Sequence, residues 1–167
     1  LFAAVDALAA LLGGIGEVKE PSDYAEDVSD GADEGQDRGS VSLCVNRGDV
    51  DADTNAGGVV GSVSIDLSFD REDELNLSSV LAGGAKYLIC ATVRECSNYA
   101  SVHAGKSAAG GIAGRMDYGA AVGCISGGAV SCNGDYAGGI AGYSAGTLRD
   151  CAARVNLTAG NYAGGIA

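Results

Sequence analysis

A short glycine-rich phrase recurs through this chain at a nearly constant interval. It reads AGGIAG at 109–114 and 137–142, AGGIA at 163–167 and AGGVVG at 56–61. The last two intervals between these phrases are nearly equal, and the first is close to twice as long and is divided by the weaker pair Gly83–Gly84. Such a period indicates one structural unit stacked on copies of itself, which restricts the possible folds more than any other feature here.

Cysteines mark the same period a second time. Four of them each precede a glycine pair by about half of the repeat. The residues that define the repeat are Cys44, Cys96, Cys124, Cys151 and the pairs Gly57, Gly58, Gly110, Gly111, Gly138, Gly139, Gly164 and Gly165. We assign these residues a structural role and expect none of them to act in catalysis or metal binding.

Aligning the chain on the cysteines places similar residues in columns at alternate positions. The two clearest columns are Val50, Val102, Val130, Leu157 and Ala52, Ala104, Cys132, Ala159. The residues between them are mostly polar, which is the alternation of a strand with one buried face. Glycines at one constant distance before three cysteines (Gly39, Gly119 and Gly146) are suited to corners. The sequence therefore predicts an all-β fold, a parallel β-solenoid with coils of about 26–28 residues.

The repeats occupy residues 39–167, and the chain stops within the phrase, so we expect it to be a piece of a longer protein. Residues 1–16 are apolar at their start and favour a short helix, which either caps the solenoid or ends an upstream helical region. Residues 17–38 hold nine carboxylates and two basic residues. This composition predicts a solvated linker or loop, with a calcium-binding or partner-binding segment as the alternative.

Residues 62–90 have two interpretations. Alternation at Val63, Ile65 and Leu67, followed by the acidic run 70–74, allows a degenerate coil of the right length. The same features fit a hairpin or loop inserted between two coils, and we favour this insertion.

Charge and cysteine spacing exclude several classes of function. A net charge of −12 argues against nucleic acid and anionic membrane surfaces as partners. The apolar run 1–12 is too short for a transmembrane helix, which needs about 20 residues. No CxxC pair supports a zinc site, so we expect the cysteines to be small buried residues, with disulfides between coils as the alternative.

Candidates for catalysis are few. Asp49, Asp51 and Asp53 share one strand face, which is more typical of a solvated surface than of a calcium loop, and His103 is the sole histidine. We find no Ser/His/Asp or Cys/His set along the sequence, so we expect no enzymatic activity and no cofactor.

The repeats resemble a known family. The phrases GGIAGRMDYG and YAGGIAGYSAGTLRDC, with the strand CVNRGDV before AGGVVG, are similar to the GLUG motif of surface and secreted proteins of Gram-positive gut anaerobes. The resemblance covers roughly residues 39–167. It implies a β-helical repeat in an extracellular or cell-surface protein, with adhesion-like or stalk functions and no established catalytic residues.

We therefore expect a non-catalytic structural or binding scaffold of an exported bacterial protein. Its expected partners are neighbouring repeats of the same longer chain and a host or cell-wall glycan or protein. The alternative is a carbohydrate-active β-helix, a glycoside hydrolase or polysaccharide lyase, using Asp66 and Asp70 with the Asp49–Asp53 face. A third possibility is a module that only spaces other domains.

Overall fold

The computed structural model describes residues 25–31, 39–64 and 87–167. The chain divides into two compact units, 1–26 with 70–88 and 27–69 with 89–167. The expected helix at 1–16 and most of the stretch 62–90 lie outside the described residues. Within the acidic segment 17–38, the described residues form strand β1 (Ala25–Asp27), which pairs with β7 (Tyr87–Ile89), and a 3₁₀ turn (Ser29–Gly31).

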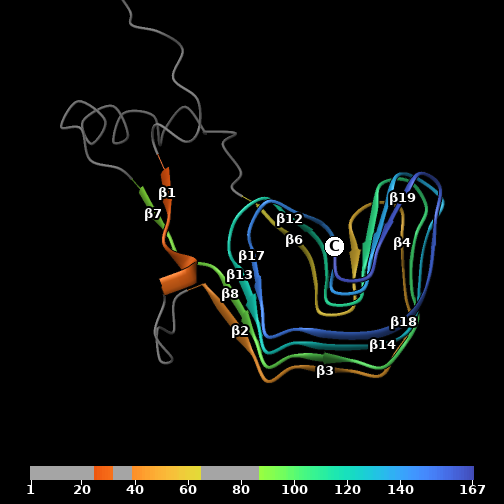
Figure 1. Ribbon diagram of the computed structural model, residues 1–167, viewed down its shortest axis with the longest axis horizontal. Coiled ribbons are helices and arrows are strands. Elements are labelled where there is room, and N and C mark those ends of the chain that lie inside the picture. Colours follow the sequence, from red (N-terminus) through yellow and green to blue (C-terminus); the bar gives the residue numbers. More distant parts are fainter. Residues whose placement is uncertain (1–24, 32–38, 65–86) are drawn as a thin grey trace, which may run out of the picture. The chain divides into compact units, whose positions relative to one another are not determined.

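The second unit is a parallel β-solenoid, as predicted (Figure 1). We call its stacked turns coil 1 (39–64), coil 2 (91–118), coil 3 (119–145) and coil 4 (146–167). The first sheet contains β2 (Ser40–Ser42), β8 (Thr92–Arg94), β13 (Ala120–Val122) and β17 (Thr147–Arg149). The next contains β3 (Val45–Asn46), β4 (Val50–Ala52), β9 (Ser97–Asn98), β10 (Val102–Ala104), β14 (Ile125–Cys132) and β18 (Ala152–Ala159).

Two further sheets complete the coils. One contains β5 (Ala56–Gly57), β11 (Ala108–Gly110), β15 (Tyr136–Gly138) and β19 (Tyr162–Gly164). The other contains β6 (Val60–Val63), β12 (Ala113–Met116) and β16 (Ala141–Ser144). Each strand pairs in parallel with its equivalent in the next coil, so that equivalent residues form columns along the stack.

The observed register matches the columns expected from the sequence. Val102 pairs with Val130 in the next coil, and Val130 pairs with Leu157 in the coil after that. Ala104, Cys132 and Ala159 align in the same way. Val102, Ala104 and Val130 are fully buried, so this column faces the core.

Coil 1 pairs directly with coil 2, although their equivalent positions are almost twice as far apart in the sequence as those of later coils. Val50 aligns with Val102, and Val60 aligns with Ala113. No coil therefore lies between these two in the sheets. Residues 65–86 lie outside the described residues, whereas Ser62 and Val63 belong to β6 and so to coil 1 itself.

The interior of the solenoid is divided into two apolar clusters by an inward fold of each coil. We call this fold the infolded hairpin, although its two arms belong to different sheets and are not paired with each other. Figure 1 shows β5 and β6 of coil 1, and their equivalents above, running into the space that the outer strands enclose. One cluster is built around Cys96, Ile112, Met116 and Cys124, and the other around Val102, Val130 and Cys132. The glycine-rich phrase forms this hairpin, which the sequence did not predict.

Asp27 and Ser29, which belong to the second unit, bind at the corners of coils 2 and 3. The Asp27 carboxylate accepts hydrogen bonds from the amides of Ser29 (3.0 Å) and Gly119 (2.6 Å), and the buried Ser29 hydroxyl accepts one from the Ala91 amide (2.9 Å). Partial burial tends to raise the pKa of Asp27, but hydrogen bonds that its carboxylate accepts from the Ser29 hydroxyl and from the Gly119 and Ser29 amides prevail and lower it. Asp27 and Ser29 thus satisfy amides at the corners of two coils.

Candidate interaction surface

The glycine pairs lie where the infolded hairpin has no room for side chains. A Cβ atom on Gly110 would overlap the Ala113 carbonyl oxygen, and one on Gly111 would overlap the Ser126 hydroxyl. Gly138 pairs with Gly110 and Gly164 with Gly138, so the same restriction recurs in successive coils. The pairs therefore let two strands approach each other inside one coil.

The four repeat cysteines form one column, and two of them, Cys96 and Cys124, belong to the first apolar cluster. Cys96 and Cys124 are fully buried, whereas Cys44 is exposed and Cys151 is half-buried. The difference follows from their coils, because Cys96 and Cys124 have a described coil on each side. All six cysteines of the chain are free thiols in the structure.

Neighbouring thiols in this column influence each other's ionisation. A hydrogen bond shared between the Cys124 and Cys151 side chains raises the pKa of Cys124, and burial raises it further. The same hydrogen bond lowers the pKa of Cys151. Cys151 is therefore the thiol of this pair that ionises first.

A second inward column is polar and lies where the hairpin meets the opposite sheet. The Asn46 amide donates to the Asn98 side-chain oxygen (2.8 Å), and the Asn98 amide donates to the Ala100 carbonyl (3.0 Å). Ser126, next in the column, is 1% exposed, and its hydroxyl has no hydrogen-bond partner among the described residues. Asn98 and Ser126 are buried against Gly58 and Gly111 of the hairpin, whereas Asn46 is half-buried.

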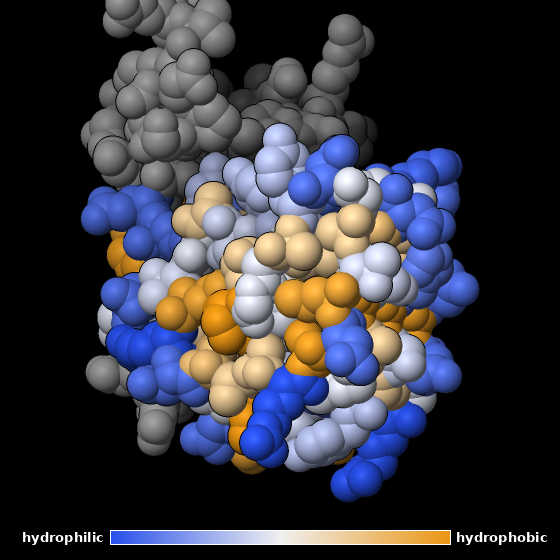
Figure 2. Space-filling model, turned by 45° about the vertical axis from the view of Figure 1, so that its right-hand side comes forward, coloured by the Kyte–Doolittle hydropathy of each residue, from blue (hydrophilic) through white to orange (hydrophobic). Residues whose placement is uncertain are grey.

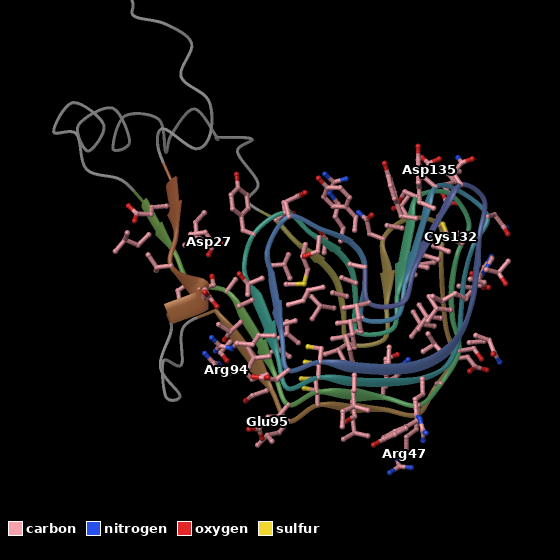
Figure 3. All side chains as sticks on the ribbon, viewed as in Figure 1. Asp27, Arg47, Arg94, Glu95, Cys132 and Asp135 are labelled. Atoms are coloured by element: carbon pink, nitrogen blue, oxygen red, sulfur yellow. The ribbon has the colours of Figure 1, made fainter. Side chains whose placement is uncertain are left out.

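The outward face of the sheet formed by β3, β9, β14 and β18 is the most varied exposed surface of the solenoid. Arg47 points away from this sheet, whereas Cys132 points into the enclosed space (Figure 3). The Arg47 guanidinium lies 5.5 Å from the centre of the Tyr99 ring, and Tyr99 is 53% exposed. Val45 and Ile125 add exposed apolar surface nearby.

Two carboxylates on this face, Asp49 and Asp53, have structural partners. Asp49 accepts a hydrogen bond from the Ser101 amide (3.0 Å), and Asp53 forms an exposed ion pair with Lys106 (2.6 Å). Asp66 and Asp70, the other candidates for carbohydrate chemistry, lie outside the described residues. Among the described residues, no group of three or more His, Cys, Asp or Glu side chains is arranged to hold a metal ion.

One nucleophile–base contact, which we did not predict, occurs on the same face. The Nδ1 atom of His103 lies 2.8 Å from the Ser131 hydroxyl, and its Nε2 atom lies 3.5 Å from the Asn133 amide nitrogen. Asp51 precedes His103 in the same column. The column alignment of the sequence contains this signal, because His103 and Ser131 occupy the same position in successive repeats.

Aromatic side chains gather where the two arms of the hairpin reach the surface. Tyr136 stacks on Tyr162 with ring centres 5.2 Å apart, and its ring meets that of Tyr143 edge-on at 5.7 Å. Arg115 lies 4.7 Å from the Tyr143 ring centre and forms an ion pair with Asp117 (2.8 Å). These contacts join strands β12, β15, β16 and β19, so the cluster fastens the hairpin mouth. The repeated YAGG sequence signals this position.

Apolar and polar surface are mixed on the exposed side of coil 4. Strand β18 alternates exposed and half-buried residues. The face of the molecule in Figure 2 likewise has apolar residues through its middle and hydrophilic residues around them. Across 25–31, 39–64 and 87–167, no helix is long and apolar enough to cross a membrane.

Comparison with known proteins supports the fold and leaves the family open. No family model matches the chain, and no curated protein does. Its structure is similar to that of a putative immunoglobulin A1 protease from Bacteroides ovatus, with a TM-score of 0.59 and 25% sequence identity. The match covers 86% of this chain and 40% of that protein, so the chain spans well under half of its length. A β-helix-like protein is supported, whereas the GLUG resemblance gains no support.

Proposed function

We propose that this chain is a non-catalytic repeat scaffold within a longer exported bacterial protein, related to GLUG-repeat proteins, and that it presents a binding surface outside the cell. The observation that carries the proposal is that the inward and outward residues of each coil have different roles. Inward columns such as Val102–Val130–Leu157 only pack, while outward residues repeat at a constant spacing of about 4.8 Å. Such an array is suited to repeated weak contacts with a glycan or a protein surface.

The location outside the cell is part of this proposal and is suggested by the GLUG resemblance alone. The Bacteroides ovatus neighbour is named a putative protease and is much longer than the matched region. In a longer protein of that kind, this region would separate or orient other domains and contribute binding. Free thiols are uncommon in oxidising compartments. Burial of Cys96 and Cys124 limits their access to oxidants, whereas Cys44 is an exposed free thiol.

Binding without turnover tests the proposal. The purified chain is applied to an array of host and bacterial cell-wall glycans and, separately, incubated with polysaccharides and with immunoglobulin A1. We expect saturable binding to members of the array and no release of sugar or peptide products. Product release that depends on a residue of this chain would overturn the scaffold function.

A hydrolytic function is a second candidate because of the contact between His103 and Ser131. Activation of a serine requires a base within hydrogen-bonding distance, and 2.8 Å meets this requirement. An oxyanion site with free amide donors is also needed. Ser131, however, lies in a strand that is paired on both sides, with the strands of His103 and of Thr158. Labelling of Ser131 by a fluorophosphonate probe, lost in Ser131→Ala and in His103→Ala, would favour this candidate.

A further inference from the structure

One outward column contains a gap between an aromatic ring and a cation. Register places Arg47, Tyr99, Gly127 and Arg154 in successive coils, because the preceding residues Asn46, Asn98 and Ser126 align and Gly127 pairs with Arg154. Neighbouring coils are about 4.8 Å apart, so two coil spacings, about 9.6 Å, separate the backbone at Tyr99 from that at Arg154. Gly127 contributes no side chain to the space between them.

The two faces of the Tyr99 ring differ in their surroundings. Arg47 lies over the ring on the coil 1 side, with its guanidinium carbon 5.5 Å from the ring centre. On the coil 3 side, a Cβ atom added to Gly127 would meet no atom closer than 3.8 Å, and one of those nearest atoms belongs to the Tyr99 ring. The exposed Ile125 side chain lies in the neighbouring outward column. One ring of a ligand can therefore occupy the missing position.

Charge selects the chemistry of that ligand. Among the described residues, Arg154 is exposed and has no ion pair or hydrogen bond, and the contact of Arg47 is with the Tyr99 ring alone. By contrast, Arg115 and Arg149 are paired with carboxylates. Two uncompensated guanidinium groups in one column favour an anionic group, despite the net charge of −12 on the whole chain.

We propose that the space above Gly127 binds a carboxylated pyranose, such as a uronate or sialate residue of a glycan. The apolar face of the sugar packs on Tyr99, and its carboxylate accepts hydrogen bonds from the Arg154 guanidinium, a geometry in which arginine binds carboxylates with two parallel bonds. This inference rests on the proposed binding function and names its ligand class.

The decisive variant fills the gap without disturbing the fold. Gly127→Val places a β-branched residue in strand β14, at a site with room for a Cβ atom, and should leave thermal unfolding unchanged or slightly raised. Binding of trigalacturonate and of sialyllactose is measured by isothermal titration calorimetry, with maltotriose as the neutral probe. We expect binding of at least one carboxylated probe, no binding of maltotriose, and at least a tenfold loss in Gly127→Val.

Charge and stacking are tested separately. Arg154→Gln and Tyr99→Ala should each weaken binding at least tenfold, whereas the matched control Arg149→Gln, which removes a paired arginine from another sheet, should bind like the wild type. The two carboxylated probes distinguish a uronate source from a sialate source. Binding unaffected by Gly127→Val, or an aromatic peptide bound at this position with no carboxylated sugar bound, would overturn the inference while leaving the scaffold function intact. Cleavage of either probe would contradict the scaffold function instead.

Discussion

At the scale of single residues, adding a side chain to a glycine of the repeated pairs should destabilise the fold far more than adding one to Gly127. A Cβ atom on Gly110 would overlap the Ala113 carbonyl within the infolded hairpin, whereas one on Gly127, on the outer sheet, would make only ordinary van der Waals contacts at 3.8 Å. Steric room, rather than backbone conformation, separates the two, because neither residue has a positive φ angle. Glycine content alone therefore does not identify the positions that the fold requires.

This contrast gives a first prediction. Gly110→Ala should lower the free energy of unfolding by about 3 kcal/mol, because the added methyl group must displace packed backbone. Gly127→Ala should raise it by about 0.5–1 kcal/mol, because alanine loses less conformational entropy on folding. Urea unfolding followed by circular dichroism measures both changes. Equal effects of the two substitutions would contradict the close approach within the hairpin.

The cysteine column gives a second prediction, which depends on pH. In the native protein, a maleimide should label Cys151 readily and Cys96 and Cys124 slowly, because the last two are buried and their pKa values are raised. The lowered pKa of Cys151 means that its reactive thiolate persists at a lower pH than that of an ordinary thiol.

A variant isolates the cause of this shift. Cys124→Ala removes the shared hydrogen bond, so the pKa of Cys151 should rise and its labelling should slow most at mildly acidic pH. The rate is followed by mass spectrometry in a Cys44→Ser background, where the exposed thiol does not compete. An unchanged pH profile in Cys124→Ala, or rapid native labelling of Cys124, would refute this account of the column.

At the scale of the strand, one column combines a satisfied and an unsatisfied polar residue. Asn98 hydrogen-bonds to Asn46 on one side and to the backbone of Ala100 on the other. Ser126 occupies the equivalent place in the next coil, and its buried hydroxyl has no partner in the described part of the chain. Burial of an unpaired hydroxyl costs free energy, whereas a fully bonded amide repays its desolvation.

The two residues should therefore respond oppositely to truncation. Asn98→Ala should lower the free energy of unfolding by about 2 kcal/mol, because the buried backbone groups of Ala100 and the half-buried Asn46 amide lose the hydrogen bonds that Asn98 makes with them. Ser126→Ala should be neutral or should stabilise by up to about 1 kcal/mol. Thermal and urea unfolding of both variants at the same pH provide the comparison. A large destabilisation by Ser126→Ala would show that the hydroxyl has a partner after all.

At the scale of the whole molecule, coil 1 pairs directly with coil 2. The solenoid should therefore not need the long stretch of sequence that lies between these two coils. Within the later coils, a short connection joins the last strand of one coil to the first of the next, as between Met116 and Ala120 and between Ser144 and Thr147. The equivalent positions between coils 1 and 2 are Val63 and Thr92. A connection as short as those of the later coils should therefore be able to join Val63 to Thr92 in a shortened chain.

A deletion tests whether the solenoid needs the stretch between coils 1 and 2. Residues 64–91 are replaced by Asp-Tyr-Gly, the connection that follows Met116, so that Val63 leads into Thr92. The shortened chain should keep a strand-rich circular dichroism spectrum and unfold cooperatively, with some loss of stability because Ala91 no longer meets Ser29. The full chain is the control. Loss of the cooperative transition would show that the removed stretch supports the solenoid.

The sequence by itself determined the solenoid class, the coil length and the register of the columns. Each of these depends on local alternation and on a period, and parallel in-register pairing converts a period directly into neighbours in space. The alignment of Val102 with Val130 and Leu157 could therefore be predicted in full. The structural role of the glycine pairs stays a prediction, and the crowding around Gly110 and Gly111 gives a reason for it that the sequence did not show.

Tertiary structure alone decided which positions meet across a coil. Ser126 meets Gly111 because the hairpin folds inward, and nothing periodic in the sequence specifies how far a coil folds into its own interior. The same path brings Tyr136 against Tyr143 from opposite arms of the hairpin. The space between Tyr99 and Arg154 depends on the absence of a side chain at one position of an exposed column. Contacts of this kind arise from the closure of the coil in three dimensions, whereas a repeat pattern records only what stacks along its axis.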